Sequence, residues 1–114
     1  IIRAFDINGG HFGVDIAEVP GESIRAVHDG TVVMSDFTAN DADTIVIQHR
    51  ENMISVYRNC YRLMKNIGDK VTKGEAIGTF SNRKAEENKK KQSFLHLELW
   101  HRGKPLDPNT YIAF

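Results

Sequence analysis

Gly10-His11-Phe12-Gly13-Val14-Asp15-Ile16 is the stretch around which this chain is organised, and a second stretch, Phe94-Leu95-His96-Leu97-Glu98-Leu99-Trp100, completes its chemistry. The first stretch offers an imidazole and a carboxylate four residues apart, with glycines where the backbone must bend. The second stretch offers one imidazole within an apolar run. Two histidines and one aspartate, His11, Asp15 and His96, form a ligand set that suits zinc and leaves a fourth coordination position open. Spacing alone leaves a simpler alternative open, in which His11 and Asp15 only hydrogen-bond each other and His96 is a half-buried histidine.

Short segments rich in β-branched and aromatic residues, separated by glycine and polar turns, dominate the rest of the chain. We expect strands at residues 31–35, 44–49, 53–57 and 94–101. Residues 23–27 form a further extended piece, and the Asp-Gly pair after it favours a type I′ hairpin. One helical turn is expected, at residues 61–65. The pattern predicts an all-β fold in which antiparallel sheets, punctuated by glycine, form an open sandwich or barrel.

Length and composition are those of one globular domain. The chain has 114 residues, and its 15 Lys and Arg balance 15 Asp and Glu, so the formal net charge is zero. This balance speaks against nucleic acid as the main partner, because a nucleic-acid-binding protein needs a basic face. No apolar run reaches the ~20 residues that cross a bilayer. The chain starts at Ile1 rather than Met, and we interpret residues 1–114 as a single domain excised from a longer protein.

Several ordered motifs make the chain resemble peptidase family M23, the LytM or lysostaphin-like domains, from end to end. The family's opening His-x-Gly-x-Asp is matched at residues 11–15, and its Asp-Gly-Thr-Val at residues 29–32. Its Gly-Asp-x-Val-x-x-Gly-x-x-Ile-Gly block is matched at residues 68–78, and its closing His-x-Glu at residues 96–98. The resemblance implies a LytM-like fold, the duplicated hybrid motif. It also implies that the family's three zinc ligands fall on His11, Asp15 and His96.

Two further histidines that flank the metal in active members are missing here. One belongs to a Tyr-x-His motif, which reads Tyr57-Arg58-Asn59, and the other opens a His-x-His motif, which reads Phe94-Leu95-His96. Zinc in such a site polarises the peptide carbonyl and activates its bound water, but an imidazole must still move the proton or stabilise the oxyanion. Asn59 is no base near neutral pH, and Phe94 has no polar group. We therefore expect no catalytic residues at these positions.

The resemblance also predicts what surrounds the metal. It implies a substrate or partner groove near Tyr57, Asn59 and Phe94, and Glu98 is expected to hydrogen-bond a ligand imidazole from outside the metal shell. The Gly-rich loop of active members is replaced by residues 81–93, which are bulky and charged. For this segment, a solvated loop and a docking surface for an acidic partner or an anionic wall polymer are both open.

The resemblance implies a function in the bacterial envelope. We expect a degenerate M23 domain that lies outside the cytoplasm, in the periplasm or cell envelope, held there by an anchor or signal outside these residues. It would bind zinc without being a peptidase and would regulate or scaffold peptidoglycan remodelling, for example by activating a cell-wall hydrolase. Its partners would be peptidoglycan, such a hydrolase or another envelope protein. The alternative is an active zinc metalloendopeptidase that cleaves peptidoglycan cross-links with an altered acid/base set, in which His49 or His28 supplies the missing imidazole.

Overall fold

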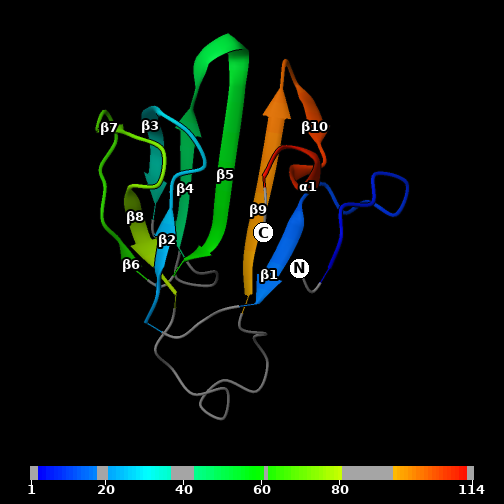
Figure 1. Ribbon diagram of the computed structural model, residues 1–114, viewed down its shortest axis with the longest axis horizontal. Coiled ribbons are helices and arrows are strands. Elements are labelled where there is room, and N and C mark those ends of the chain that lie inside the picture. Colours follow the sequence, from blue (N-terminus) through cyan, green and yellow to red (C-terminus); the bar gives the residue numbers. More distant parts are fainter. Residues whose placement is uncertain (1–2, 18–20, 37–42, 61, 81–93, 113–114) are drawn as a thin grey trace.

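The computed structural model describes residues 3–17, 21–36, 43–60, 62–80 and 94–112, and its regular elements are nearly all antiparallel strands. A seven-stranded sheet has the order β1-β9-β5-β4-β3-β7, with β10 beside β9, and a three-stranded sheet has the order β2-β8-β6 (Figure 1). The predicted all-β fold is confirmed. The elements are β1 (Val14–Ala17), β2 (Ser23–Arg25), β3 (Gly30–Asp36), β4 (Asp43–Gln48), the 3₁₀ turn η1 (Arg50–Asn52), β5 (Met53–Cys60), β6 (Arg62–Leu63), β7 (Lys70–Val71), β8 (Ala76–Thr79), β9 (Phe94–His101), β10 (Lys104–Leu106) and α1 (Pro108–Tyr111).

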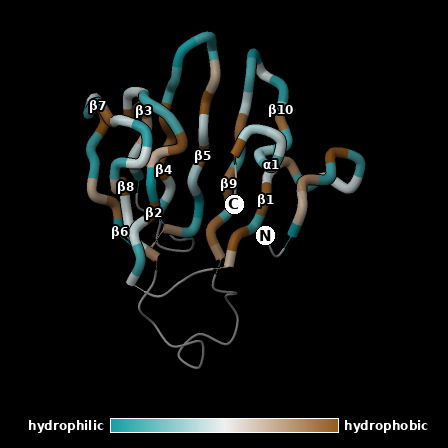
Figure 2. The backbone as a smooth tube through the Cα atoms, in the orientation of Figure 1, coloured by the Kyte–Doolittle hydropathy of each residue, from teal (hydrophilic) through white to brown (hydrophobic). Residues whose placement is uncertain are grey.

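The core lies between the two sheets. Residues that face each other across an antiparallel ladder point to the same side, so the ladder registers divide the central strands of the large sheet into two faces. Ile24 of β2 and Ile77 of β8 pack against the inner face from the small sheet. Hydrophobic segments follow these strands, whereas the hairpin tips are hydrophilic (Figure 2). The buried residues of the inner face are Ile45, Ile47, Ser55, Tyr57, Leu95, Leu97 and Leu99.

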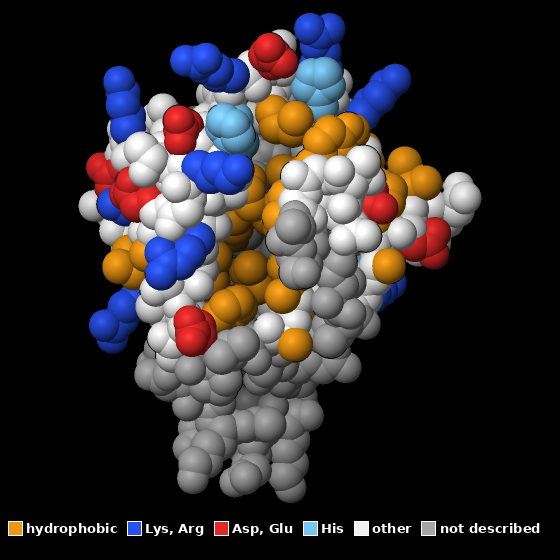
Figure 3. Space-filling view, viewed as in Figure 1, with side chains coloured by type: hydrophobic (Ala, Val, Ile, Leu, Met, Phe, Trp, Pro, Cys, Tyr) orange, Lys and Arg blue, Asp and Glu red, His pale blue; other side chains and the backbone are white. Residues whose placement is uncertain are grey.

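The small sheet leaves part of the molecule's apolar surface open. On the face shown in Figure 3, hydrophobic side chains gather in a hollow between the region of the small sheet and the region of β9 and α1, with Lys and Arg side chains to its left and above it. Among the described residues, no helix has the length and hydropathy that crossing a membrane requires.

Two local predictions are wrong. The Asp29-Gly30 pair does not form a type I′ hairpin, because β2 pairs with β8 while β3 pairs with β4 and β7. Neither residue has the positive φ that such a turn needs, and the segment instead carries the chain from the small sheet to the large one. The helical turn expected at residues 61–65 is also wrong, since Arg62–Leu63 form strand β6 beside β8. The charged segment 81–93 lies outside the described residues.

A hydrogen-bonded network of polar groups is buried at the inner face of β4 and β5. His49 Nδ1 lies 2.7 Å from the Asp29 carbonyl oxygen, and its Nε2 lies 2.7 Å from Ser55 Oγ, which is 2.8 Å from Tyr57 Oη. The Val27 N–H donates to Tyr57 Oη at 3.0 Å. Because a carbonyl oxygen can only accept, Nδ1 of His49 carries the proton and Nε2 accepts from Ser55. With His49 neutral, every polar group of this network has a hydrogen-bond partner. The network links β5 to the segment between β2 and β3.

This network makes the stability of the fold depend on pH. Burial lowers the pKa of His49 below its ordinary value of 6.5, against the bond to the Asp29 carbonyl, which favours the charged form. The folded chain then binds fewer protons at His49 than the unfolded chain does. The stabilisation should be complete above the unfolded pKa and should decrease as the pH falls toward the lower, folded pKa. Urea unfolding at about pH 5, 6, 7 and 8 measures this change.

The variant His49→Gln is the control for that prediction. It keeps every other histidine, so the difference between the two proteins isolates the contribution of His49. The free energy of unfolding of the unchanged chain should fall more steeply below pH 6.5, the ordinary pKa of histidine, than that of His49→Gln. Equal slopes in the two proteins would show that His49 is not held neutral by the fold.

Gly13 lies where the chain comes closest to β9. A Cβ atom placed there would lie 2.4 Å from the Leu97 carbonyl oxygen and 2.8 Å from Glu98 Cγ. Because a central strand cannot move aside, Gly13→Ala should destabilise the chain by about 1–3 kcal/mol, the range for overpacking. Gly10→Ala is the matched control, since nothing lies within 4 Å of its Cβ position and only its φ of 80° is strained. Thermal unfolding measures both, and a Gly13→Ala variant as stable as the unchanged chain would contradict the prediction.

Candidate metal centre

The segment that carries His11 is held by the chain that precedes it. Asp6 and His11 exchange backbone hydrogen bonds of 2.9 and 2.8 Å, and the Asp15 N–H donates to the Arg3 carbonyl oxygen at 2.9 Å. Residues 7–10 reverse the chain, with Gly10 at a φ of 80°, and form the loop that projects beside β1 in Figure 1. This pairing fixes the backbone on both sides of His11 before the chain enters β1.

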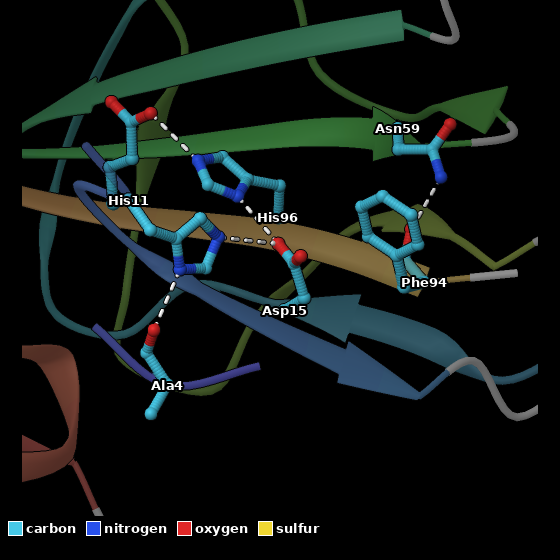
Figure 4. Close-up of polar contacts among 7 residues, drawn as sticks. Ala4, His11, Asp15, Asn59, Phe94 and His96 are labelled. Atoms are coloured by element: carbon cyan, nitrogen blue, oxygen red, sulfur yellow. Dashed lines mark hydrogen bonds and ion pairs between the residues drawn. The ribbon is translucent and has the colours of Figure 1, made fainter. Parts of the chain in front are cut away.

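His11, Asp15 and His96 meet on the outer face of the large sheet, where β1 pairs with β9 (Figure 4). Asp15 stands directly opposite His96 in that ladder, although 81 residues separate them. One candidate ligand atom from each of the three residues lies within 4.8 Å of the others. His11 and Asp15 are both 6% exposed, so the three predicted ligands form one largely buried cluster.

The orientation of His11 favours a cation in this cluster. Its Nδ1 lies 2.7 Å from the Ala4 carbonyl oxygen, which can only accept, so Nδ1 carries a proton. Its Nε2 is buried, lies 3.3 Å from Asp15 Oδ1 and has no hydrogen-bond partner among the described residues. In a neutral imidazole this places a lone pair against a carboxylate oxygen, which is unfavourable unless a proton or a metal ion lies between them. The donor set and its geometry therefore fit a zinc ion.

Carboxylates face both nitrogens of His96. Its Nε2 lies 2.8 Å from Glu98 Oε2, and its Nδ1 lies 2.6 Å from Asp15 Oδ1. These contacts raise the pKa of His96, with the Glu98 bond as the largest cause and burial opposing it. Burial also raises the pKa of Glu98, but bonds from His96 and Trp100 and the charge of Arg58 outweigh it, so the net pKa is lowered. Glu98 thus occupies the position that the sequence predicted, beside a candidate ligand imidazole.

A zinc ion held by His11, Asp15 and His96 would supply a Lewis acid and an activated water molecule. Asn59 and Phe94 stand at the two positions where the family resemblance led us to expect flanking histidines. Asn59, at a φ of 74°, donates its side-chain amide to the Phe94 carbonyl oxygen, so this donor is bound to the backbone of β9 (Figure 4). Phe94 adds only an apolar ring.

Neither of the two substitute histidines is placed at the metal centre. His49 uses both ring nitrogens in the buried network that contacts the inner face of the large sheet. The ring of His28 lies 6.1 Å from that of His49, between centroids, and therefore belongs to the same region. His96 lies on the outer face. The altered acid/base set that we considered for an active peptidase thus finds no support from His28 or His49.

A groove of about 660 Å³ runs over the outer face of β5 and β9. Its residues are Gln48, Asn52, Ile54, Val56, Arg58, Glu98, Trp100, Arg102 and Gly103. The prediction that Tyr57 lines a groove is wrong: the residue points into the core, is 1% exposed, and its burial raises the pKa to about 12. Asn59 and Phe94 are partly buried near the ends of described segments, and their part in a groove stays a prediction.

Sequence reasoning missed Arg58 and Trp100 as residues of the groove. Both belong to motifs quoted above. Arg58 lies between Tyr57 and Asn59, and Trp100 ends the second organising stretch. The missing information was the register: Arg58 pairs with His96, and Trp100 pairs with Ile54. The alternation of side chains along a strand identifies two faces but does not say which one carries the metal centre.

Comparison with known proteins identifies the family. The model of peptidase family M23 matches residues 9–108. The chain is 31% identical over 114 residues to a lipoprotein NlpD/LppB homolog of Pseudomonas aeruginosa, and 28% identical over 114 residues to the murein hydrolase activator NlpD of Escherichia coli. Each match covers 98% of this chain but only 37% and 29% of the respective relative, so the chain spans about a third of their length.

The fold agrees with this match. The structure of Helicobacter pylori Csd3 superposes with a TM-score of 0.79 at 24% identity, over 100% of this chain and 31% of that one. At this level of identity the likeness shows a shared fold and no more. The family match rests on the sequence model, which covers most of the chain, and the chain therefore belongs to peptidase family M23.

Proposed function

We propose that this domain binds zinc through His11, Asp15 and His96 but does not cleave peptide bonds. The main observation in favour of a bound metal ion is the buried Nε2 of His11. It faces Asp15 Oδ1 at 3.3 Å and has no hydrogen-bond partner among the described residues. The identity of the metal is argued from the donor set, since two imidazoles and one carboxylate with an open position suit zinc.

The absence of peptidase activity is argued from the groups around the metal. A water bound to zinc still needs a base or an oxyanion donor within hydrogen-bond reach, and each can be worth about 10²–10⁴ in rate. The amide of Asn59 is bound to the Phe94 carbonyl oxygen, and both nitrogens of His49 are used on the other face of the sheet. Glu98 accepts hydrogen bonds from His96 and Trp100, so each of its two carboxylate oxygens already has a partner.

We infer a role in the bacterial cell envelope, outside the cytoplasm, as a regulator or scaffold of peptidoglycan remodelling. One relative is named a murein hydrolase activator and another a lipoprotein, and both are matched over 98% of this chain. A domain that keeps its groove without proton-transfer groups is suited to binding. The partner would be peptidoglycan, a cell-wall hydrolase or another envelope protein.

Metal analysis tests the zinc site. The purified chain should bind one zinc ion, and His11→Ala should weaken the affinity by at least about tenfold, because it removes one of three protein ligands. His28→Ala is the matched control, since His28 is exposed and lies with His49, away from the cluster. Atomic absorption after dialysis measures the stoichiometry. Zinc retained equally by both variants would place the metal elsewhere.

Release of dye from labelled peptidoglycan tests the activity. The zinc-loaded chain alone should release no dye above background, and it should increase the release caused by a separate purified cell-wall amidase. The active endopeptidase predicts the opposite for the chain alone: release that disappears in His96→Ala. That result would overturn the non-enzymatic proposal and would leave the zinc site intact.

A further inference from the structure

Trp100 lies between the groove and the metal centre. Its side chain lines the groove, opposite Ile54 of β5 in the ladder. Its indole N–H donates to Glu98 Oε1 at 2.7 Å, and the other oxygen of that carboxylate lies 2.8 Å from His96 Nε2. One carboxylate therefore joins a surface of the groove to a candidate metal ligand through two short hydrogen bonds.

The chemistry of these bonds fixes the direction of each. The Trp100 N–H can only donate, and His96 must also donate from Nε2 when its Nδ1 faces a cation. The residue between them must accept twice, from opposite sides. A carboxylate has an acceptor oxygen for each donor, whereas an amide at this position would turn its NH₂ group toward one of them. Glu98, which is 9% exposed, is suited to this double acceptance.

A second contact joins the same indole to the other histidine of the site. The rings of Phe12 and Trp100 lie with centroids 6.2 Å apart at an interplanar angle of 59°. Phe12 follows His11 directly in the chain, and its side chain is 40% exposed. A displacement of the indole would therefore reach His96 through Glu98 and His11 through Phe12.

We propose that Trp100 is a positioning residue for the metal centre, and that it couples occupation of the groove to zinc affinity. This inference rests on the zinc site of the proposed function. The indole holds Glu98, Glu98 orients the imidazole of His96, and the Nδ1 lone pair of His96 is thereby aimed at the metal. Through the same two hydrogen bonds, zinc bound at the site would change the environment of the indole.

Zinc affinity, measured by competition with a chromophoric chelator, tests the first half of the proposal. Trp100→Phe keeps an aromatic ring but removes the N–H, and it should weaken zinc binding about threefold to tenfold, the effect of one hydrogen bond. Glu98→Gln should weaken it by about 10–100-fold, as expected for partners of ligand histidines. Ile67→Val is the matched control, because Ile67 is 66% exposed and belongs neither to the groove nor to the metal cluster. It should bind zinc like the unchanged chain.

Fluorescence tests the second half without relying on a loss of binding. The chain has one tryptophan, so its emission reports Trp100 alone. Titration with zinc should change the emission of the unchanged chain with the midpoint found by chelator competition. In Glu98→Gln, zinc concentrations that fill the weaker site should produce a much smaller change. Circular dichroism checks that each variant is folded.

The outcomes separate this inference from the proposed function. If the unchanged chain binds no zinc, the metal site and the coupling both fail. If it binds zinc but Trp100→Phe has the same affinity and the emission is insensitive to zinc, the coupling alone is overturned. Weaker binding in Trp100→Phe together with a zinc-dependent emission that requires Glu98 supports the coupling.

Discussion

The register between β1 and β9 is the constraint on which the site depends. Val14 is opposite Leu97, and Asp15 is opposite His96. The first pair is buried in the core and the second points to the outer face, so the burial that stabilises the fold also aligns two of the candidate ligands. A slip of one residue would bury Asp15 among aliphatic side chains and expose Val14, at a large cost in free energy. The packing of the core therefore fixes the alignment of these two candidate ligands.

On the two faces of the large sheet, the pKa of a histidine is shifted in opposite directions. On the inner face, the ring nitrogens of His49 contact a carbonyl oxygen and a hydroxyl, and burial lowers its pKa. On the outer face, the bond to Glu98 and the contact with Asp15 raise the pKa of His96 despite burial. The difference lies in the partners, since a hydroxyl and a carbonyl satisfy the neutral ring whereas carboxylates favour the cation. The outer face is therefore electrostatically prepared for positive charge, and the inner face excludes it.

The sequence predicted the parts of this arrangement that have a local signature. Strands and the all-β class follow from β-branched runs, and the three candidate ligands follow from the resemblance of the motifs to family M23. The Asp29-Gly30 turn failed because local turn preference does not determine which strand is paired across it, and β2 joins the other sheet. The assignment of Tyr57 to a groove failed for a related reason, because its face is set by its register with Leu97, 40 residues along the chain. Trp100 gives no local signal of the Glu98 contact.

Under the proposed function, a metal at this position has a use that does not depend on proton-transfer groups. His11 and Asp15 belong to the segment that begins at Arg3, which is attached to the sheet through β1, whereas His96 lies on the central strand β9. A zinc ion bound by all three would join the amino-terminal segment to β9 and would stabilise only the folded state, by an amount set by its concentration relative to the dissociation constant. The same ion would relieve the contact between the His11 lone pair and Asp15 Oδ1. In the proposed binding role, this link would make the sheet beside the groove more rigid, so the three ligands would be useful without catalytic imidazoles.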